Sequence, residues 1–245
     1  MSKREGAWSR AQNWISDHPD LERWLRLISP AFLYSALDER LSFQEALSKA
    51  FKKKVPSHAL RDGWCMGGTA LLVLVSQAVT GVLLAVYYKP SPEAAYASIR
   101  YIEQEVSMGW LIRQIHAWGA NLMIIFVLLH MTRVFVNKCY RHPRELTWVT
   151  GTLALFITMG FGFTGYLLPW DQLSYWASTV GSGLADGVPV IGPSLLVLIR
   201  AGESVSGLTL ARFYALHTVV LPWAVAAVLV GHFMIIRRLG ISKPL

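Results

Sequence analysis

Four of the seven histidines in this 245-residue chain lie inside long apolar runs, where an ionisable side chain is costly and usually serves a function. They form two sets, His116 with His130 and His217 with His232. Fourteen residues separate the first two, close to four helical turns, so both imidazoles project from one helix face about 21 Å apart. The other two are 15 residues apart, which rotates them by about 60° from a common face.

The elements that must hold these histidines are membrane spans. Each run exceeds the roughly 18 apolar residues that mark a spanning helix. Of the whole chain, 53% is hydrophobic and only 16% is charged, which excludes a disordered or nucleic-acid-coating protein despite a net charge of +8. The sequence therefore predicts an all-α membrane protein with a four-transmembrane-helix bundle. The predicted spans cover 64–88, 110–136, 147–168 and 213–236, and 188–199 is expected to form an interfacial helix.

The charge distribution predicts the topology. Segments on one side of the four spans carry +9 and those on the other side carry −1, which together give the +8 of the chain. By the positive-inside rule both termini lie on the negative (n) side. The two histidine-bearing spans then run parallel, so His116 meets His217 near the positive (p) side and His130 meets His232 near the n side. Each pair is expected to supply two axial ligands to one haem.

Arginines and glycines around the histidines fit this interpretation. Arginines outward of each histidine could contact haem propionates, although snorkelling at helix ends would also explain any one of them. The glycines of the other two spans repeat the 14-residue interval, and a haem edge close to a helix needs a residue without Cβ, as does close helix packing. The candidate propionate residues are Arg113, Arg133, Arg144, Arg212 and Arg237. The candidate haem-packing residues are Gly67, Gly81, Gly151 and Gly165.

The first 62 residues differ from the rest of the chain. Aromatic and aliphatic residues recur there at helical spacing between charges, which predicts an amphipathic n-side helix on the membrane surface. Residues 63–245 are predicted to form the dihaem transmembrane domain. The start of the chain lacks the apolar stretch of a signal peptide, and two cysteines, Cys65 and Cys139, are too few for a disulfide framework.

Several motifs resemble the cytochrome b6 family, the dihaem subunits of quinol-oxidising Rieske/cytochrome b complexes, and their menaquinol-type bacterial relatives. The resemblance covers the chain from about residue 37 to its end. It is carried by YYKPSPEAAYASIRYI at 87–102, HPRELTWVTG at 142–151, GYLLPWDQLSYWA at 165–177, PVIGPSLL at 189–196 and ARFYALHTVVLPW at 211–223.

The resemblance implies a mechanism and partners. Quinol would be oxidised on the p side, with one electron passing to a Rieske iron–sulfur protein and the other through the two haems to an n-side quinone. Trp170, Asp171 and Trp176 would line part of the quinol pocket. A subunit IV-like chain, a c-type cytochrome and a dimeric complex are also implied. Cys65, in Cys-x-Gly-Gly, would attach an additional c-type haem covalently.

Two departures from the family pattern favour a bacterial menaquinol enzyme in the cytoplasmic membrane over a thylakoid one. Ala117 follows the first histidine where the chloroplast-type protein has an arginine, and about 33 N-terminal residues have no counterpart. Two other functions remain open from the residues: the dihaem membrane anchor of a formate dehydrogenase or hydrogenase, and a haem-free proton-coupled transporter. No nucleic-acid partner is expected.

Overall fold

The computed structural model describes residues 65–240, which contain helices and loops and no β-strand. Four of its helices are long and apolar enough to cross a membrane. This confirms the predicted all-α, four-span architecture, and the predicted surface helix at 1–62 lies outside the described residues. The spans are α6 (Met66–Ala85), α8 (Gly109–Val136), α9 (Glu145–Leu167) and the continuous helix Gly207–Leu239.

The last span begins earlier than the sequence predicts. It consists of α12 (Gly207–Ala215), a π-helical turn η2 (Leu216–Val220) and α13 (Leu221–Leu239). Its first turn is closed by a capping box, in which the side chains of Ser206 and Thr209 each bond the other's backbone N–H. Such a cap satisfies backbone donors that would otherwise be unpaired at the helix start.

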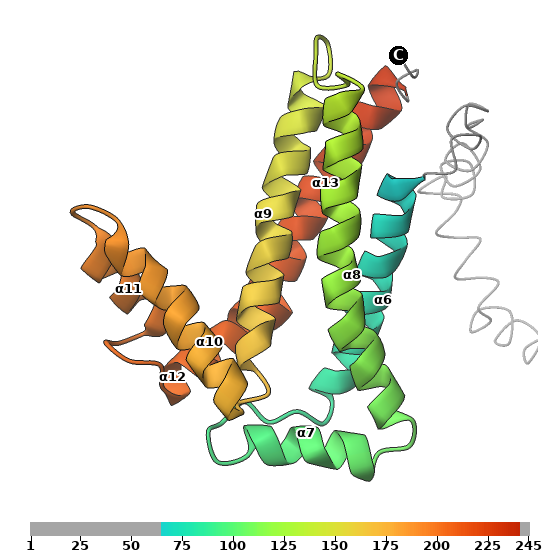
Figure 1. The fold of residues 1–245 in the computed structure, drawn as a ribbon. Helices are drawn as coiled ribbons and strands as arrows, with labels where there is room; N and C mark the ends of the chain where they lie inside the picture. The colour runs from blue at the N-terminus through green and yellow to red at the C-terminus, as the bar shows by residue number, and fades with distance from the viewer. Residues whose placement is uncertain (1–64, 241–245) are drawn as a thin grey trace, which may run out of the picture. The chain divides into compact units, whose positions relative to one another are not determined.

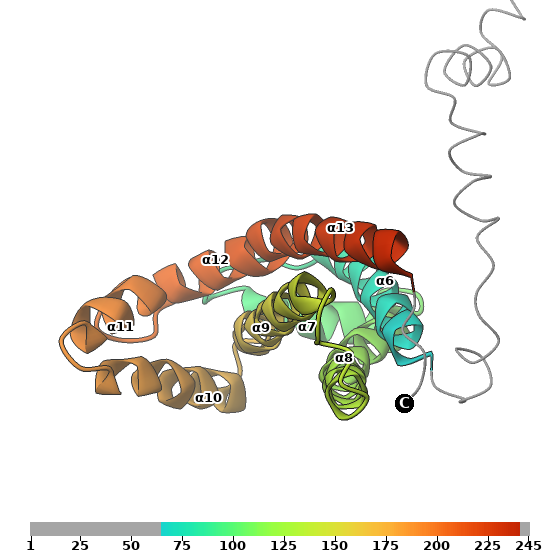
Figure 2. The same ribbon diagram turned by 90° about the horizontal axis from the view of Figure 1, so that it is seen from above.

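The spans pack as two antiparallel pairs. Helix α6 packs mainly against α8, and α9 packs mainly against α13, while α8 and α9 also touch (Figures 1 and 2). The start of α6, the α8–α9 loop and the end of α13 lie at one end of the bundle (Figure 1). We call this the cationic end, because the loop carries Lys138, Arg141 and Arg144 and α13 finishes with Arg237 and Arg238.

Shorter helices occupy the opposite end of the bundle. Helix α7 (Ala95–Gln104) joins α6 to α8. The connection from α9 to α12 contains α10 (Gln172–Gly183), a 3₁₀ turn η1 (Leu184–Gly187) and α11 (Gly192–Arg200). Helix α11 matches the helix expected at 188–199. Helices α7 and α10 were not anticipated, since both are too short and too polar to resemble a span.

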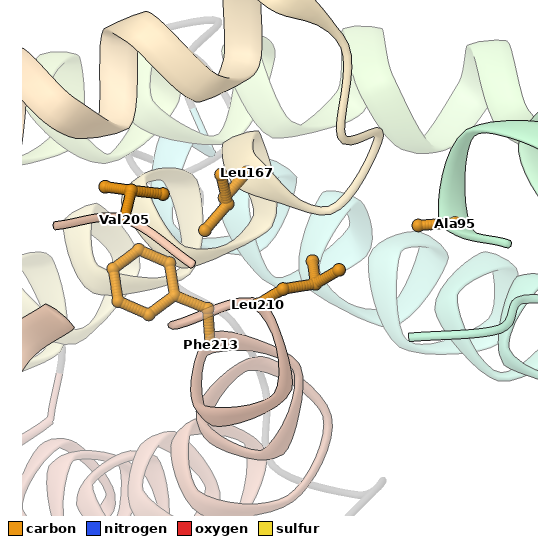
Figure 3. Close-up of a cluster of buried hydrophobic side chains, with 5 residues drawn as sticks. All are labelled: Ala95, Leu167, Val205, Leu210 and Phe213. Atoms are coloured by element: carbon orange, nitrogen blue, oxygen red, sulfur yellow. The ribbon is translucent and has the colours of Figure 1, made fainter. Parts of the chain in front are cut away.

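Tight apolar packing is concentrated at this opposite end. Ala95 from α7 and Leu167 from α9 are fully buried together with Leu210 and Phe213 from α12, and Val205 completes the cluster (Figure 3). In the spans themselves, large apolar residues face outward, as at Leu72, which is 70% exposed. Lipid is the medium that such a surface requires, so the chain is a multi-pass membrane protein.

Candidate functional site

The first histidine pair lies inside the bundle toward the opposite end. His116 extends from α8 and His217 from the π turn of the last span. Their ring centroids are 6.2 Å apart and their planes meet at 73°. That separation leaves room for a single metal ion bonded to both rings at about 2 Å.

The second histidine pair lies toward the cationic end. His130 from α8 and His232 from α13 line one cavity of about 380 Å³, and His232 is buried. Apolar side chains form most of the wall, including Val225, Leu229 and Ile236 from α13. An apolar cavity of this size with two convergent polar groups is typical of a cofactor site.

Each of the four predicted glycines faces one histidine ring. A Cβ built on Gly165 would lie 2.6 Å from Cε1 of His217, closer than real Cβ contacts come. The same construction on Gly81 gives 3.2 Å to His116. At the cationic end, Gly67 approaches His130 at 3.2 Å and Gly151 approaches His232 at 3.3 Å. Each glycine therefore leaves space for an imidazole ring between the helices. The sequence predicts that these glycines make room for the edge of a haem, whereas in the structure they make room for its candidate ligands.

A set of hydroxyls that the sequence interpretation missed contacts three of the rings. Thr80, Thr150 and Thr164 lie within hydrogen-bonding distance of Nδ1 of His116, His232 and His217. Each threonine directly precedes a glycine that faces the same histidine. That Thr-Gly pairing, repeated three times, was the signal available in the sequence.

The π turn explains how His217 and His232, 15 residues apart, can lie opposite His116 and His130, which are 14 residues apart. A π turn accommodates one extra residue within a helix, so the 15 residues from His217 to His232 rotate about as far as 14 α-helical residues do. His217 and His232 therefore have about the same relative rotation as His116 and His130, in place of the offset of about 60° expected for a regular helix. Pro222, at the start of α13, cannot donate a backbone hydrogen bond to the preceding turn, which favours the irregularity there.

The predicted arginines fall into two groups. Arg133 and Arg144 line the cavity of His130 and His232, and Arg144 also donates to the carbonyl oxygen of Gly240 at 2.7 Å. Arg113 pairs with the carboxylate of Glu103 on α7, and Arg212 donates to the carbonyl oxygen of Leu198 on α11.

The fifth arginine, Arg237, lies one residue beyond the cavity-lining Ile236 on α13. It is not among the cavity's lining residues in the described part of the chain. The structure thus brings two of the five predicted arginines to the second histidine pair.

Both cysteines line the cavity of the second histidine pair. Cys65 is exposed at the start of α6, and its Sγ would lie 3.2 Å from a Cβ on Gly68. Cys139 is half-buried in the α8–α9 loop, where its thiol bonds the carbonyl oxygen of Asn137. Cys65 therefore sits at the mouth of the same cavity as His130.

The predicted quinol-pocket residues follow α9 at the opposite end. Trp170 adopts a positive φ of 54°, and Asp171 caps α10 by accepting from the Ser174 N–H at 2.7 Å. Trp176 lies on α10 and is exposed. Tyr88, just after the end of α6, holds this turn by donating to the carbonyl oxygen of Leu168 at 2.6 Å. Burial raises the pKa of its phenol, so the hydroxyl keeps the proton that it donates.

The donor set fits haem better than a protein-ligated metal ion. Each site presents two imidazoles from facing helices, and bis-imidazole axial ligation is a common way to hold haem iron. In residues 65–240 no three His, Cys, Asp or Glu side chains come together as a metal cluster. Glycines against the rings and the apolar cavity between the helix pairs suit a flat, largely apolar group.

Four membrane spans with paired interior histidines define the class of the protein as a membrane electron-transport cytochrome. The family described as Cytochrome b/b6/petB matches residues 51–240. The chain belongs to this cytochrome b/b6 family.

Two relatives and one solved structure illustrate the similarity. The chain is 46% identical over 213 residues to cytochrome b6 of Synechococcus elongatus, covering 87% of this chain and 99% of that protein. Identity to cytochrome b6 of Prochlorococcus marinus (strain AS9601) is also 46% over 213 residues, covering 87% and 97%. A structure titled "Hyperthermophilic respiratory Complex III" matches with a TM-score of 0.73 and 33% identity, over 86% of this chain and 56% of that one.

Proposed function

We propose that the chain is the dihaem cytochrome b subunit of a quinol:cytochrome c or plastocyanin-type oxidoreductase. His116 and His217 are the axial ligands of one haem b, and His130 and His232 are those of the other. The observation that carries the proposal is the repeated arrangement of two imidazoles from facing helices, each ring against a glycine, at two depths of one bundle. Haem bound there supplies reversible one-electron chemistry at its iron.

The charge distribution supports a direction for electron transfer. We assign the cationic end to the n side, the cytoplasmic face of a bacterial membrane, because positively charged loops remain on that side. Quinol oxidation then belongs to the opposite end, where Trp170, Asp171 and Trp176 follow α9. The two histidine pairs lie at two depths of the bundle, so haems held there would carry electrons from the p side to an n-side quinone.

Further residues are assigned to the haem groups. Arg133 and Arg144 are assigned to haem propionates at the cationic end, and their place in the cavity lining supports this assignment. Arg237 is assigned to the same end, and Arg113 and Arg212 to the other, where each also keeps its protein partner.

Cys65 is proposed to carry an additional haem through a thioether bond. Its exposed thiol at the mouth of the cavity supports this assignment. Denaturing electrophoresis with haem staining tests it: the wild-type band and Cys139→Ala should stain, and Cys65→Ala should not. An unstained wild-type band, or staining that survives Cys65→Ala, would contradict the attachment.

The proposed partners follow from the family. They are a subunit IV-like chain, a Rieske iron–sulfur protein and a c-type cytochrome in a dimeric complex. The chain spans 56% of the length of the respiratory Complex III chain that it matches. Menaquinol is the proposed substrate, on the evidence of Ala117 and the N-terminal extension.

The decisive experiment is purification from native membranes. Pyridine haemochrome analysis should give two haems b per chain, subunit identification should find a Rieske protein, and mass analysis of extracted quinone should find menaquinone. Fewer than two haems b per chain would overturn the ligand assignment. Co-purification with a molybdenum or nickel subunit in place of a Rieske protein would overturn the complex, and plastoquinone would overturn the substrate.

A further inference from the structure

Within residues 65–240, three of the four interior histidines contact a threonine hydroxyl and the fourth, His130, does not. The Oγ1 atoms of Thr80 and Thr150 lie 2.9 Å from Nδ1 of His116 and His232, respectively. Thr164 Oγ1 lies 3.2 Å from Nδ1 of His217. These threonines come from α6 and α9, the spans that carry no candidate ligand.

The direction of these hydrogen bonds follows from the other bond that each hydroxyl makes. Thr80, Thr150 and Thr164 each donate their one hydroxyl proton to the carbonyl oxygen four residues earlier, at 2.7 to 2.8 Å. With its proton engaged, each oxygen can only accept from the histidine. Nδ1 of each ring must therefore carry the proton.

His217 provides independent support for this tautomer. Its Nδ1 also lies 3.1 Å from the carbonyl oxygen of Phe161, a group that can only accept. With the proton on Nδ1, the lone pair of Nε2 remains free to bind a metal. The threonines, together with the Phe161 carbonyl at His217, thus favour one tautomer and one orientation of the ring.

His130 lacks the equivalent contact. The residue before its facing glycine, Gly67, is Met66, whose thioether is at most a weak acceptor. Within residues 65–240, no hydrogen bond to the His130 ring is found. The pair at the opposite end therefore has two hydroxyl-bonded rings and the pair at the cationic end has one.

We propose that Thr80, Thr150 and Thr164 are positioning residues that set the electron-donating strength of the histidine pairs. An imidazole that donates its second N–H to an acceptor becomes a more basic ligand. A more basic ligand favours oxidised iron, so loss of a threonine hydroxyl should raise the reduction potential of the haem at that histidine pair. This inference rests on the proposed assignment of these histidines as haem ligands.

A crossover experiment on the whole complex tests the proposal by redox titration of each haem's α band. Thr80→Val should shift the one-electron equilibrium of the haem at His116 about tenfold toward the reduced form, which is about 59 mV, and leave the other haem unchanged. Thr150→Val should shift the haem at His232 in the same direction and leave the haem at His116 unchanged. Thr132→Val is the matched control on α8, because its hydroxyl bonds only the carbonyl oxygen of Leu128 among the described residues. Potentials that stay unchanged in both variants, or that move equally at both haems, would overturn the proposal.

Thr80→Ser keeps the proposal testable if Thr80→Val loses haem. Serine retains the hydroxyl and loses the methyl group, so a wild-type haem content and potential in Thr80→Ser would support the role of the hydroxyl. Haem loss in both variants would assign the effect to packing and overturn the proposal. Haem content of the wild-type protein distinguishes failure of the proposed function from failure of this inference. Fewer than two haems b in the wild-type protein contradicts the proposed function, whereas two haems b with unchanged potentials in the valine variants contradicts only this inference.

Discussion

At the scale of single residues, the site depends on pairs in which a histidine ring packs directly against a glycine. The closest of these contacts joins Gly165 and His217, where an added Cβ would lie 2.6 Å from the ring. Overpacking of a filled interior generally costs about 1–3 kcal/mol and shifts side chains from their positions. Since a ligand imidazole must be placed within a fraction of an ångström, such a shift affects binding more than folding.

Gly165→Ala is expected to displace His217 and to remove the haem at that end while the other haem remains. Haem content and the visible spectrum of the purified protein measure this directly. Gly231→Ala is the matched control, because Gly231 adjoins His232 but has open space around it. It should keep both haems and stabilise its helix by up to about 1 kcal/mol. Two haems with a wild-type spectrum in Gly165→Ala would show that the contact is not restrictive.

At the scale of helices, the π turn at Leu216–Val220 brings the last span into register with α8. Its extra residue is the difference between a 15-residue and a 14-residue interval. Deletion of Val219, whose side chain is exposed, should therefore convert the turn to regular α-helix and retain both haems. Deletion of the exposed Ile125 from α8, which has no such turn, should rotate His116 by about 100° relative to His130 and abolish dihaem binding. Equal haem loss in both deletions would contradict this explanation.

Helices α10 and α11 are joined through the buried side chain of Arg200. Its guanidinium donates to the hydroxyl of Ser182 at 2.8 Å and to the carbonyl oxygens of Thr179 and Glu203 at 2.7 and 2.8 Å. Thr209 of α12 in turn donates to the carbonyl oxygen of Arg200. Arg200 thus connects α11 to α10 through its side chain and to α12 through its backbone carbonyl.

Arg200→Met is expected to loosen this connection, because hydrogen bonds from a charged donor contribute about 1.5–3 kcal/mol each. Limited proteolysis should then cut the segment between α10 and α11 at a higher rate. Arg100→Met, which removes a half-exposed side chain 3.9 Å from Glu103, is the control and should change little. Cleavage at the wild-type rate in Arg200→Met would argue against the proposed connection.

At the scale of the molecule, the bundle is filled less by its own side chains than a soluble core is. No span has more than 11% of its most apolar window buried, and a cavity of about 380 Å³ separates the helices at the cationic end. The well-packed apolar cluster lies at the other end, around Leu167 and Phe213. A group bound between the helix pairs would therefore contribute much of the packing within the bundle.

Haem depletion should accordingly destabilise the whole bundle. A ligand present at 100 times its dissociation constant stabilises the native state by about 2.7 kcal/mol. Protein produced without haem is expected to unfold at a lower temperature in detergent, with recovery on adding haem. Thermal unfolding followed by helical circular dichroism measures both midpoints. Identical midpoints for the two forms would mean that the helices pack without the group.

Much of this arrangement was available from the order of residues. Apolar run length determined the four spans, and the 14-residue intervals indicated which histidines and glycines share a depth, because helical rise and rotation are regular. Helices α7 and α10 escaped prediction, since short amphipathic helices at a membrane surface lack the hydropathy of a span. The hydroxyl contacts of Thr80, Thr150 and Thr164 also escaped it, because periodicity within one helix does not reveal which neighbour a side chain meets.

The sequence by itself therefore determined the contents of the helices. All four spans carry an apolar surface for lipid, two of them carry two histidines each, and the loops and helix ends on one side carry the positive charge. Only the tertiary structure decided how those helices combine. The π turn removed a rotation that regular helical geometry predicts, and Arg144 came to the second histidine pair whereas Arg113 paired with Glu103. The physical reason is that intervals along a helix follow from local geometry, whereas ring tautomers and ion pairs depend on atoms brought together from different helices.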